Sequence, residues 1–179
     1  MNNRRDKFIG LLLALSLCQG ALALSTDRDQ PINIEADRAE ADNAKRITTY
    51  YGDVIIIQGT LKITGETVTI QYDEQDRLTK LVSEGKPARF RQLPDGKADT
   101  PENYQVAKAA RMEYYARKDL IVLLGNAVYG HEGDQVAAER IVYDSVKSQM
   151  KAESRAAAEG EGQTSSSRVK IKIQPKKTP

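Results

Sequence analysis

Apolar residues recur at every second position along much of the chain from Pro31 onward. The alternation is clearest in four short sets: Ile32/Ile34, Leu61/Ile63, Val68/Ile70/Tyr72 and Val169/Ile171/Ile173. Because successive side chains of a strand point to opposite faces of a sheet, this spacing is typical of antiparallel strands with one buried face. The chain is therefore expected to be all-β.

Short turn motifs separate these segments, at Gly52-Asp53, Gly59-Thr60, Asp73-Glu74, Pro94-Asp95-Gly96, Gly125-Asn126 and Gly133-Asp134. Many short strands with regular turns favour a sandwich, jelly roll or barrel. Between Ile63 and Val68 the apolar phase shifts by one residue, so we expect a bulge or bend at Gly65-Glu66. Two Ala-rich stretches, 36–44 and 152–158, have few large apolar residues and are expected to be strand or linker.

A weak internal repeat is also present. Ala36, Arg38, Glu40 and Gly52 align with Ala109, Arg111, Glu113 and Gly125, and Ile70-Gln71-Tyr72-Asp73 then aligns with Ile141-Val142-Tyr143-Asp144. Either the chain contains two copies of one sheet unit, or these few identities arose by chance.

The N-terminal 23 residues have the form of a secretory signal peptide. Arg4, Arg5 and Lys7 precede an apolar run, and Ala21-Leu22-Ala23 is a cleavage site. The run is too short to span a membrane, and Leu17 before Cys18 argues against lipidation. We therefore expect a signal peptide over 1–23, a β domain over 24–152, a flexible link over 153–167, a C-terminal strand over 168–174 and a disordered tail over 175–179.

Composition excludes several classes of function. The excess of 27 Lys and Arg over 25 Asp and Glu comes from the signal segment. The exported chain therefore has no net positive charge that would favour nucleic-acid binding. His131 is the only histidine and Cys18 the only cysteine, so no metal site or cofactor is expected. Asp73 and Asp76 resemble a glycosidase pair only by proximity, because Asp is common in turns. The chain is not expected to be an enzyme.

Two segments are apolar at consecutive positions, residues 54–57 and 120–124. Such runs are found in strands buried on both faces. They are also compatible with a sheet whose apolar interior is left open for a lipid chain.

Four segments carry a family resemblance: residues 29–37 (DQPINIEAD), 52–63 (GDVIIIQGTLKI), 85–90 (GKPARF) and 123–127 (LLGNA). In this order the chain resembles the periplasmic lipopolysaccharide-transport bridge proteins, the LptA, OstA-like family. The resemblance implies an open, twisted antiparallel β jelly roll, a V-shaped two-sheet sandwich with an apolar interior. It also implies a non-enzymatic protein of the periplasm, which carries lipopolysaccharide from an inner-membrane export complex to an outer-membrane translocon.

The resemblance further implies roles for particular residues. The lipid A acyl chains would contact a groove lined by Ile34, Val54, Ile56, Leu61, Ile63, Phe90, Met112, Leu120, Val122, Val128, Ile141 and Tyr143. The edge strands would dock partners and further copies head to tail, through Ile32 and Ile34 at the N-terminal edge and Val169, Ile171 and Ile173 at the C-terminal edge. The inner-membrane partner belongs at the first edge and the translocon at the second, unless the last strand only closes its own sheet.

A periplasmic β-sandwich that binds glycans, or a structural module, is the alternative. Sugar recognition favours exposed aromatic platforms, but the chain lacks Trp. Its tyrosine pairs, Tyr50-Tyr51 and Tyr114-Tyr115, place their members on opposite faces of a strand.

The signal segment predicts that export removes residues 1–23. Intact-mass measurement of the protein recovered from the periplasm should give a chain beginning at Leu24. An acylated chain beginning at Cys18 would contradict this cleavage site and identify a lipoprotein instead.

Overall fold

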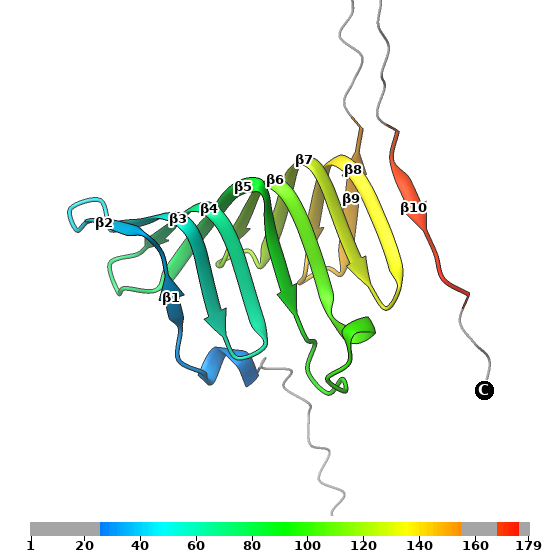
Figure 1. The fold of residues 1–179 in the computed structure, drawn as a ribbon, viewed down its shortest axis with the longest axis horizontal. Coiled ribbons are helices and arrows are strands. Elements are labelled where there is room, and N and C mark those ends of the chain that lie inside the picture. Colours follow the sequence, from blue (N-terminus) through cyan, green and yellow to red (C-terminus); the bar gives the residue numbers. More distant parts are fainter. Residues whose placement is uncertain (1–25, 155–167, 176–179) are drawn as a thin grey trace, which may run out of the picture.

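A computed structural model describes residues 26–154 and 168–175, which form one antiparallel sheet (Figure 1). No α-helix occurs among these residues, which confirms the all-β prediction. The strands are β1 (Asn33–Glu35), β2 (Arg38–Asp42), β3 (Ile47–Gln58), β4 (Leu61–Tyr72), β5 (Leu78–Gln92), β6 (Gln105–Tyr115), β7 (Leu120–His131), β8 (Asp134–Asp144), β9 (Gln149–Glu153) and β10 (Lys170–Lys172). Two 3-10 turns, η1 (Thr26–Asp29) and η2 (Pro101–Asn103), complete the described structure.

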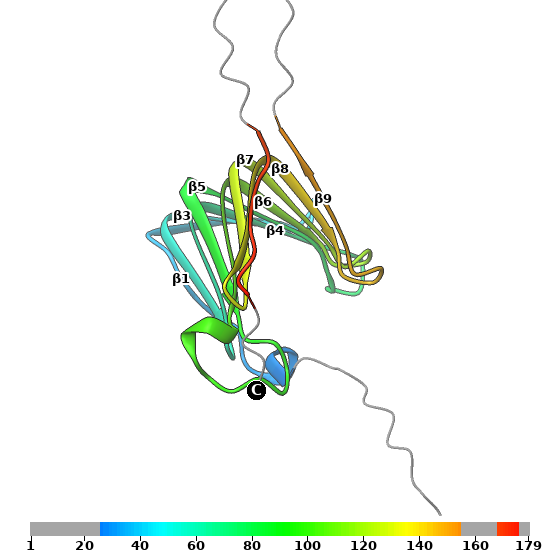
Figure 2. The ribbon, with the colours of Figure 1, turned by 90° about the vertical axis from the view of Figure 1, so that its right-hand side faces the viewer.

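Consecutive strands from β3 to β8 pair with each other, and the short strands sit at the two edges. β1 and β2 both pair with β3, whereas β9 and β10 both pair with β8. Figure 2 shows the sheet folded into an inverted V, with the six long strands bending as they pass from one arm to the other. The predicted V-shaped jelly roll is thus the observed architecture.

We call the two halves arm A and arm B. Arm A contains β1, β10 and the parts of the long strands at residues 54–65, 88–92, 105–109 and 127–138. Arm B contains β2, β9 and the parts at residues 47–51, 67–72, 78–84, 111–115, 120–124 and 140–144. Arm A faces the viewer in Figure 1.

β-Bulges produce the bend between the arms. Register shifts occur at the same level in successive strand pairs, including the shift between Thr64 and Thr67 that confirms the predicted bulge at Gly65-Glu66. The predicted turns at Gly52-Asp53 and Gly125-Asn126 are wrong, because both pairs lie inside long strands and form bulges with positive φ. Gly and Asx residues favour the left-handed conformation that turns and bulges share.

The core lies on the inner face of the V, next to the bend. Side chains from arm A are small there, at Gly65, Ala88, Ala109, Ala127 and Ala138. Those from arm B in the adjacent row are mostly larger, at Val68, Met112, Leu123 and Ile141, and they form one buried cluster with the four alanines. Small side chains on one arm let the arms approach, so the bend is closely packed.

The remaining sequence-based boundaries have mixed outcomes. The Ala-rich stretch 36–44 contains β2, as expected. The C-terminal strand predicted over 168–174 is the shorter β10, and it pairs with β8 of its own sheet. The signal peptide, nearly all of the flexible link and most of the tail lie outside the described residues. None of the helical turns described is long or apolar enough to cross a membrane.

Asp27 attaches the N-terminal turn η1 to the tip of arm A. Its carboxylate is 4% exposed and accepts hydrogen bonds from the Thr60 backbone N–H and hydroxyl, both at 2.7 Å, and from the Gln92 amide at 3.0 Å. Burial alone would raise the pKa of Asp27, but these hydrogen bonds outweigh it and lower the pKa. The ionised carboxylate is therefore the form that holds the turn in place.

We expect Asp27→Ala to lower the free energy of unfolding by about 1–3 kcal/mol, because it removes a buried carboxylate and leaves the partly buried Thr60 donors without that partner. Because folding lowers the Asp27 pKa, its contribution is present above the ordinary carboxyl value of 3.8 and is lost as pH falls through the folded value. Urea unfolding at neutral and acidic pH would measure both effects. The exposed Asp29→Ala is the matched control, and an equal loss in that variant would contradict the role of Asp27.

Candidate functional site

Away from the bend, the inner face of the V remains apolar but is only partly buried. On arm A this surface includes Ile34, Leu61, Phe90, Tyr129 and Val136, and on arm B it includes Tyr72, Leu78, Tyr114, Ile121 and Met150. All of them pack against the buried cluster while retaining solvent contact. The two arms therefore close on each other at the bend and leave a strip of apolar surface accessible beyond it.

Two tyrosines join the arms near the C-terminal edge of the sheet. Tyr129 belongs to arm A and Tyr143 to arm B, and their rings stack with centroids 5.9 Å apart and planes inclined by 22°. Burial, and to a smaller extent the neighbouring Tyr143, raises the pKa of Tyr129 to about 12. The phenol therefore remains neutral, as expected for a group that faces an apolar interior.

Most residues predicted to line a groove do share the inner face. The cross-strand registers place Ile34, Ile56, Ile63 and Phe90 in one row of arm A, and Met112 and Ile141 in one row of arm B. The same face carries Val54, Leu61 and Tyr143.

Three of the predicted lining residues lie on the opposite, outer face. Leu120 lies opposite Tyr115, Val122 opposite Glu113, and Val128 opposite Lys108. The inner positions of β7 are occupied instead by Ile121, Leu123 and Tyr129. The run 120–124 is apolar on both faces, so alternation alone did not determine which set points inward.

Several inner-face residues were not among the predicted set, notably Val68, Ile70, Leu81, Tyr114 and Tyr129. Val68 and Ile70 alternate with polar residues in the sequence, so this alternation could have identified them as inner-face residues. The tyrosine pairs behave as predicted, because Tyr50 and Tyr114 pack against the core whereas Tyr51 and Tyr115 lie on the outer face.

The outer face of arm B explains why Val122 is buried there. Glu113, directly opposite Val122, accepts a hydrogen bond from Tyr115 and pairs with Arg111 and Lys80. Burial raises the pKa of Glu113, but the donors from these three residues outweigh it and bring the pKa to about 2. Each charge of this network is paired, so the burial of Glu113 is compensated by its partners and gives no reason to assign a reactive group here.

The residues considered as candidates for catalysis or metal binding do not form such a site in the described part of the chain. Asp73 accepts bonds from the backbone N–H groups of Gln75 and Arg77 and pairs with Arg117, while Asp76 pairs with Arg46. These carboxylates stabilise a turn and do not form an acid pair. His131 ends β7 near Glu132, and no group of three or more metal-ligating side chains occurs among the described residues.

The residues predicted to dock partners lie at the two edges of the sheet. At the N-terminal edge Ile32 is exposed, while Ile34 in β1 turns inward opposite Ile56. At the C-terminal edge Val169 packs against the core, while Ile171 and Ile173 are exposed. Each edge therefore combines a short strand with an exposed apolar side chain.

Comparison with known proteins agrees with this architecture. The family model described as "LptA/(LptD N-terminal domain) LPS transport protein" matches residues 33–149. The chain is 37% identical over 175 residues to the lipopolysaccharide export system protein LptH of Pseudomonas aeruginosa, covering 98% of this chain and 96% of LptH. It is 32% identical over 150 residues to LptA of Escherichia coli K12, covering 82% and 78% of the two chains.

The crystal structure of Pseudomonas aeruginosa LptH, titled a periplasmic component of the lipopolysaccharide transport device, has the same fold. The TM-score is 0.67 at 34% identity, and the match covers 83% of this chain and 99% of that chain. Both relatives are named as components of a lipopolysaccharide export system, which agrees with the expectation of a transport protein. The matching family model, the near full-length relatives and the shared fold together show that this chain belongs to the LptA/(LptD N-terminal domain) family of lipopolysaccharide transport proteins.

Proposed function

We propose that this protein is a periplasmic bridge for lipopolysaccharide. It binds the acyl chains of lipid A against the inner face of the V and leaves the sugars and phosphates in water at the opening. Copies join head to tail, so that their inner faces form one continuous path. The N-terminal edge of the chain of copies meets the inner-membrane export complex, and the C-terminal edge meets the outer-membrane translocon.

The observation that carries this proposal is the partly exposed apolar strip on the inner face. Ile34, Phe90, Tyr129, Ile121 and Met150 all retain solvent contact although the buried core lies directly beside them. Covering such surface with acyl chains is favourable by about 25 cal/mol per Å2 of apolar area removed from water. The hydrophobic effect that stabilises the packed bend thus also favours lipid binding farther from the bend.

The same geometry disfavours a glycan-binding module. Sugar stacking needs an accessible aromatic face, but every tyrosine of the chain is at least partly buried. The rings on the outer face are occupied as well, because Arg38 lies over Tyr51, Lys80 over Tyr115 and Arg91 over Tyr104.

The two edges support head-to-tail assembly in two ways. In the described structure β1 and β2 pair only with β3, and β9 and β10 pair only with β8, so each edge presents unpaired backbone groups. The edges also differ in charge, because β1 and β2 contain Glu35, Glu40 and Asp42 with a single cation, whereas residues 168–172 contain three cations and no acid. Joining unlike edges by strand addition gives an open, heterologous contact that extends into a rod.

The lipid-binding face can be tested with two neighbouring residues of β3. Ile56 points inward and is 4% exposed, whereas Ile57 points outward and is 38% exposed. A carboxylate without a partner costs several kcal/mol in an apolar site but is hydrated at the outer face. Ile56→Asp should therefore reduce lipopolysaccharide binding at least about tenfold, and Ile57→Asp by less than about twofold, in a fluorescence displacement assay.

Circular dichroism must show that both variants fold. A second pair, Phe90→Ser on the inner face and Val142→Ser on the outer face of arm B, avoids introducing a buried charge and should give the same ranking. Equal losses within both pairs would identify this region as ordinary core, and unchanged binding in all four variants would contradict the proposed lipid site.

Charge reversal can test the assembly. Glu35 and Lys170 lie at opposite edges of arm A, both on its outer face. Glu35→Lys, or Lys170→Glu with Lys172→Glu, should weaken self-association roughly three- to tenfold in sedimentation velocity, because like charges then meet at the junction. Mixing the two variants should restore association between unlike copies. Unchanged association in every variant would exclude a junction between these edges.

A further inference from the structure

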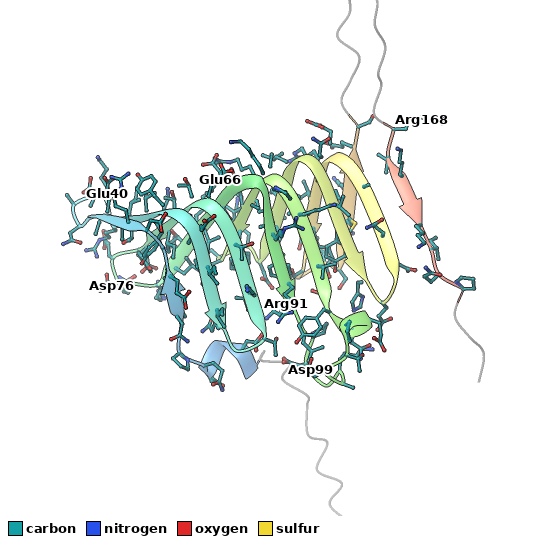
Figure 3. The ribbon with its side chains drawn as sticks, viewed as in Figure 1. Glu40, Glu66, Asp76, Arg91, Asp99 and Arg168 are labelled. Carbon is teal, nitrogen blue, oxygen red and sulfur yellow. The ribbon has the colours of Figure 1, made fainter. Side chains whose placement is uncertain are left out.

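The outer face of arm A carries four cations in adjacent strands: Lys62 on β4, Arg89 and Arg91 on β5, and Lys108 on β6. We call this set the cationic face. The sheet register places Lys62 directly opposite Arg91 and Arg89 directly opposite Lys108. Figure 3 labels Arg91 on the arm turned toward the viewer. Each cation therefore has another cation directly opposite it, and Arg89 and Arg91 are also neighbours on the same face of β5.

Acidic partners are missing at the cationic face. Within residues 26–154 and 168–175 none of its four side chains forms an ion pair, and the guanidinium of Arg91 instead lies 4.9 Å from the centre of the Tyr104 ring. The outer face of arm B differs, because its Lys80 and Arg111 are paired with Glu113 and Glu84. Cations in the central strands of arm B are thus paired with acids, whereas the four cations of the cationic face on arm A are not.

This arrangement works against the stability of the free protein. Like charges directly opposite each other across two strands are destabilising. Local features that oppose folding without a compensating contact are found mainly at functional sites. An anion that binds between the strands would supply the missing compensation.

The surface at this site is hollowed and partly apolar. A depression of about 470 Å3 is lined by all four cations together with Val106, Val128 and Gln135. Val106 is 45% exposed, and Ile57 lies beside Lys62 on the same face. Exposed apolar side chains among unpaired cations match an amphiphile at a membrane surface better than a freely soluble anion, because the apolar groups gain nothing from the latter.

We propose that the cationic face binds the phosphate of an anionic phospholipid headgroup and, in a copy that has not joined a rod, holds the outer face of arm A against a membrane surface. This site lies on the opposite side of the sheet from the proposed lipopolysaccharide path and does not depend on it. The protein would thus contact lipid twice, with acyl chains inside the V and phosphate headgroups outside it.

Vesicle co-sedimentation with the whole exported protein tests this proposal. The vesicles contain phosphatidylcholine with about 30 mol% phosphatidylglycerol and no lipopolysaccharide, and pure phosphatidylcholine is the neutral comparison. Lys62→Gln with Lys108→Gln should weaken binding to the anionic vesicles at least about tenfold. The matched control is Lys118→Gln with Lys151→Gln, which removes two exposed lysines that make no ion pair in the described structure and should change binding less than about twofold.

A second variant, Arg89→Gln with Arg91→Gln, removes the other two cations of the face and should reproduce the loss. Melting curves should show that all variants fold, since removal of opposed like charges does not destabilise a sheet. Equal weakening by the control pair would reduce the effect to net charge and overturn the proposal. So would binding of inorganic pyrophosphate, dependent on the same lysines, without binding of anionic vesicles. Failure here leaves lipopolysaccharide binding inside the V untouched, because the vesicles contain none.

Discussion

The whole structure depends on one constraint, which is that each long strand must keep its apolar side chains on the inner face of both arms. A regular strand cannot do this through a sharp bend, because alternation would carry half of its apolar residues outward. The bulges solve the problem at one level of the sheet, with Gly52-Asp53 in β3 and Gly125-Asn126 in β7 at equivalent places. This equivalence also agrees with the internal repeat seen in the sequence.

Side-chain size along the inner face then divides it into a core and an accessible surface. Alanines at 88, 109, 127 and 138 allow the arms to meet at the bend, where the larger Leu123 and Ile141 fill the space. Farther out, bulky residues such as Phe90 and Tyr114 pack against this core and stay partly exposed. A single apolar pattern thus stabilises the fold near the bend and provides a surface for acyl chains beyond it.

The outer face of the V also differs between the two arms, in the pairing of its charges. On arm B, Lys80 and Arg111 are paired with acids in the network around Glu113, whereas on arm A the cationic face has no ion pair within the described residues. The sheet edges carry opposite charges, acidic at β1 and β2 and basic at residues 168–172. Because the sheet is open, these differences give the molecule a direction from one edge to the other, which a closed barrel would lack.

The sequence alone predicted the strands and the bulge or bend at Gly65-Glu66, because a period of two and its interruption are local properties. The V-shaped jelly roll was implied only by the family resemblance. The same resemblance implied the inward position of Ile56 and Phe90. The sequence did not separate a turn from a bulge at Gly52-Asp53, since both use the same backbone conformation. For Leu120, Val122 and Val128, the facing was decided only by the register of β7 against β6 and β8. The tertiary structure alone brought Lys62, Arg89 and Lys108 together, because neighbours in a sheet are set by pairing between strands that are distant in the chain.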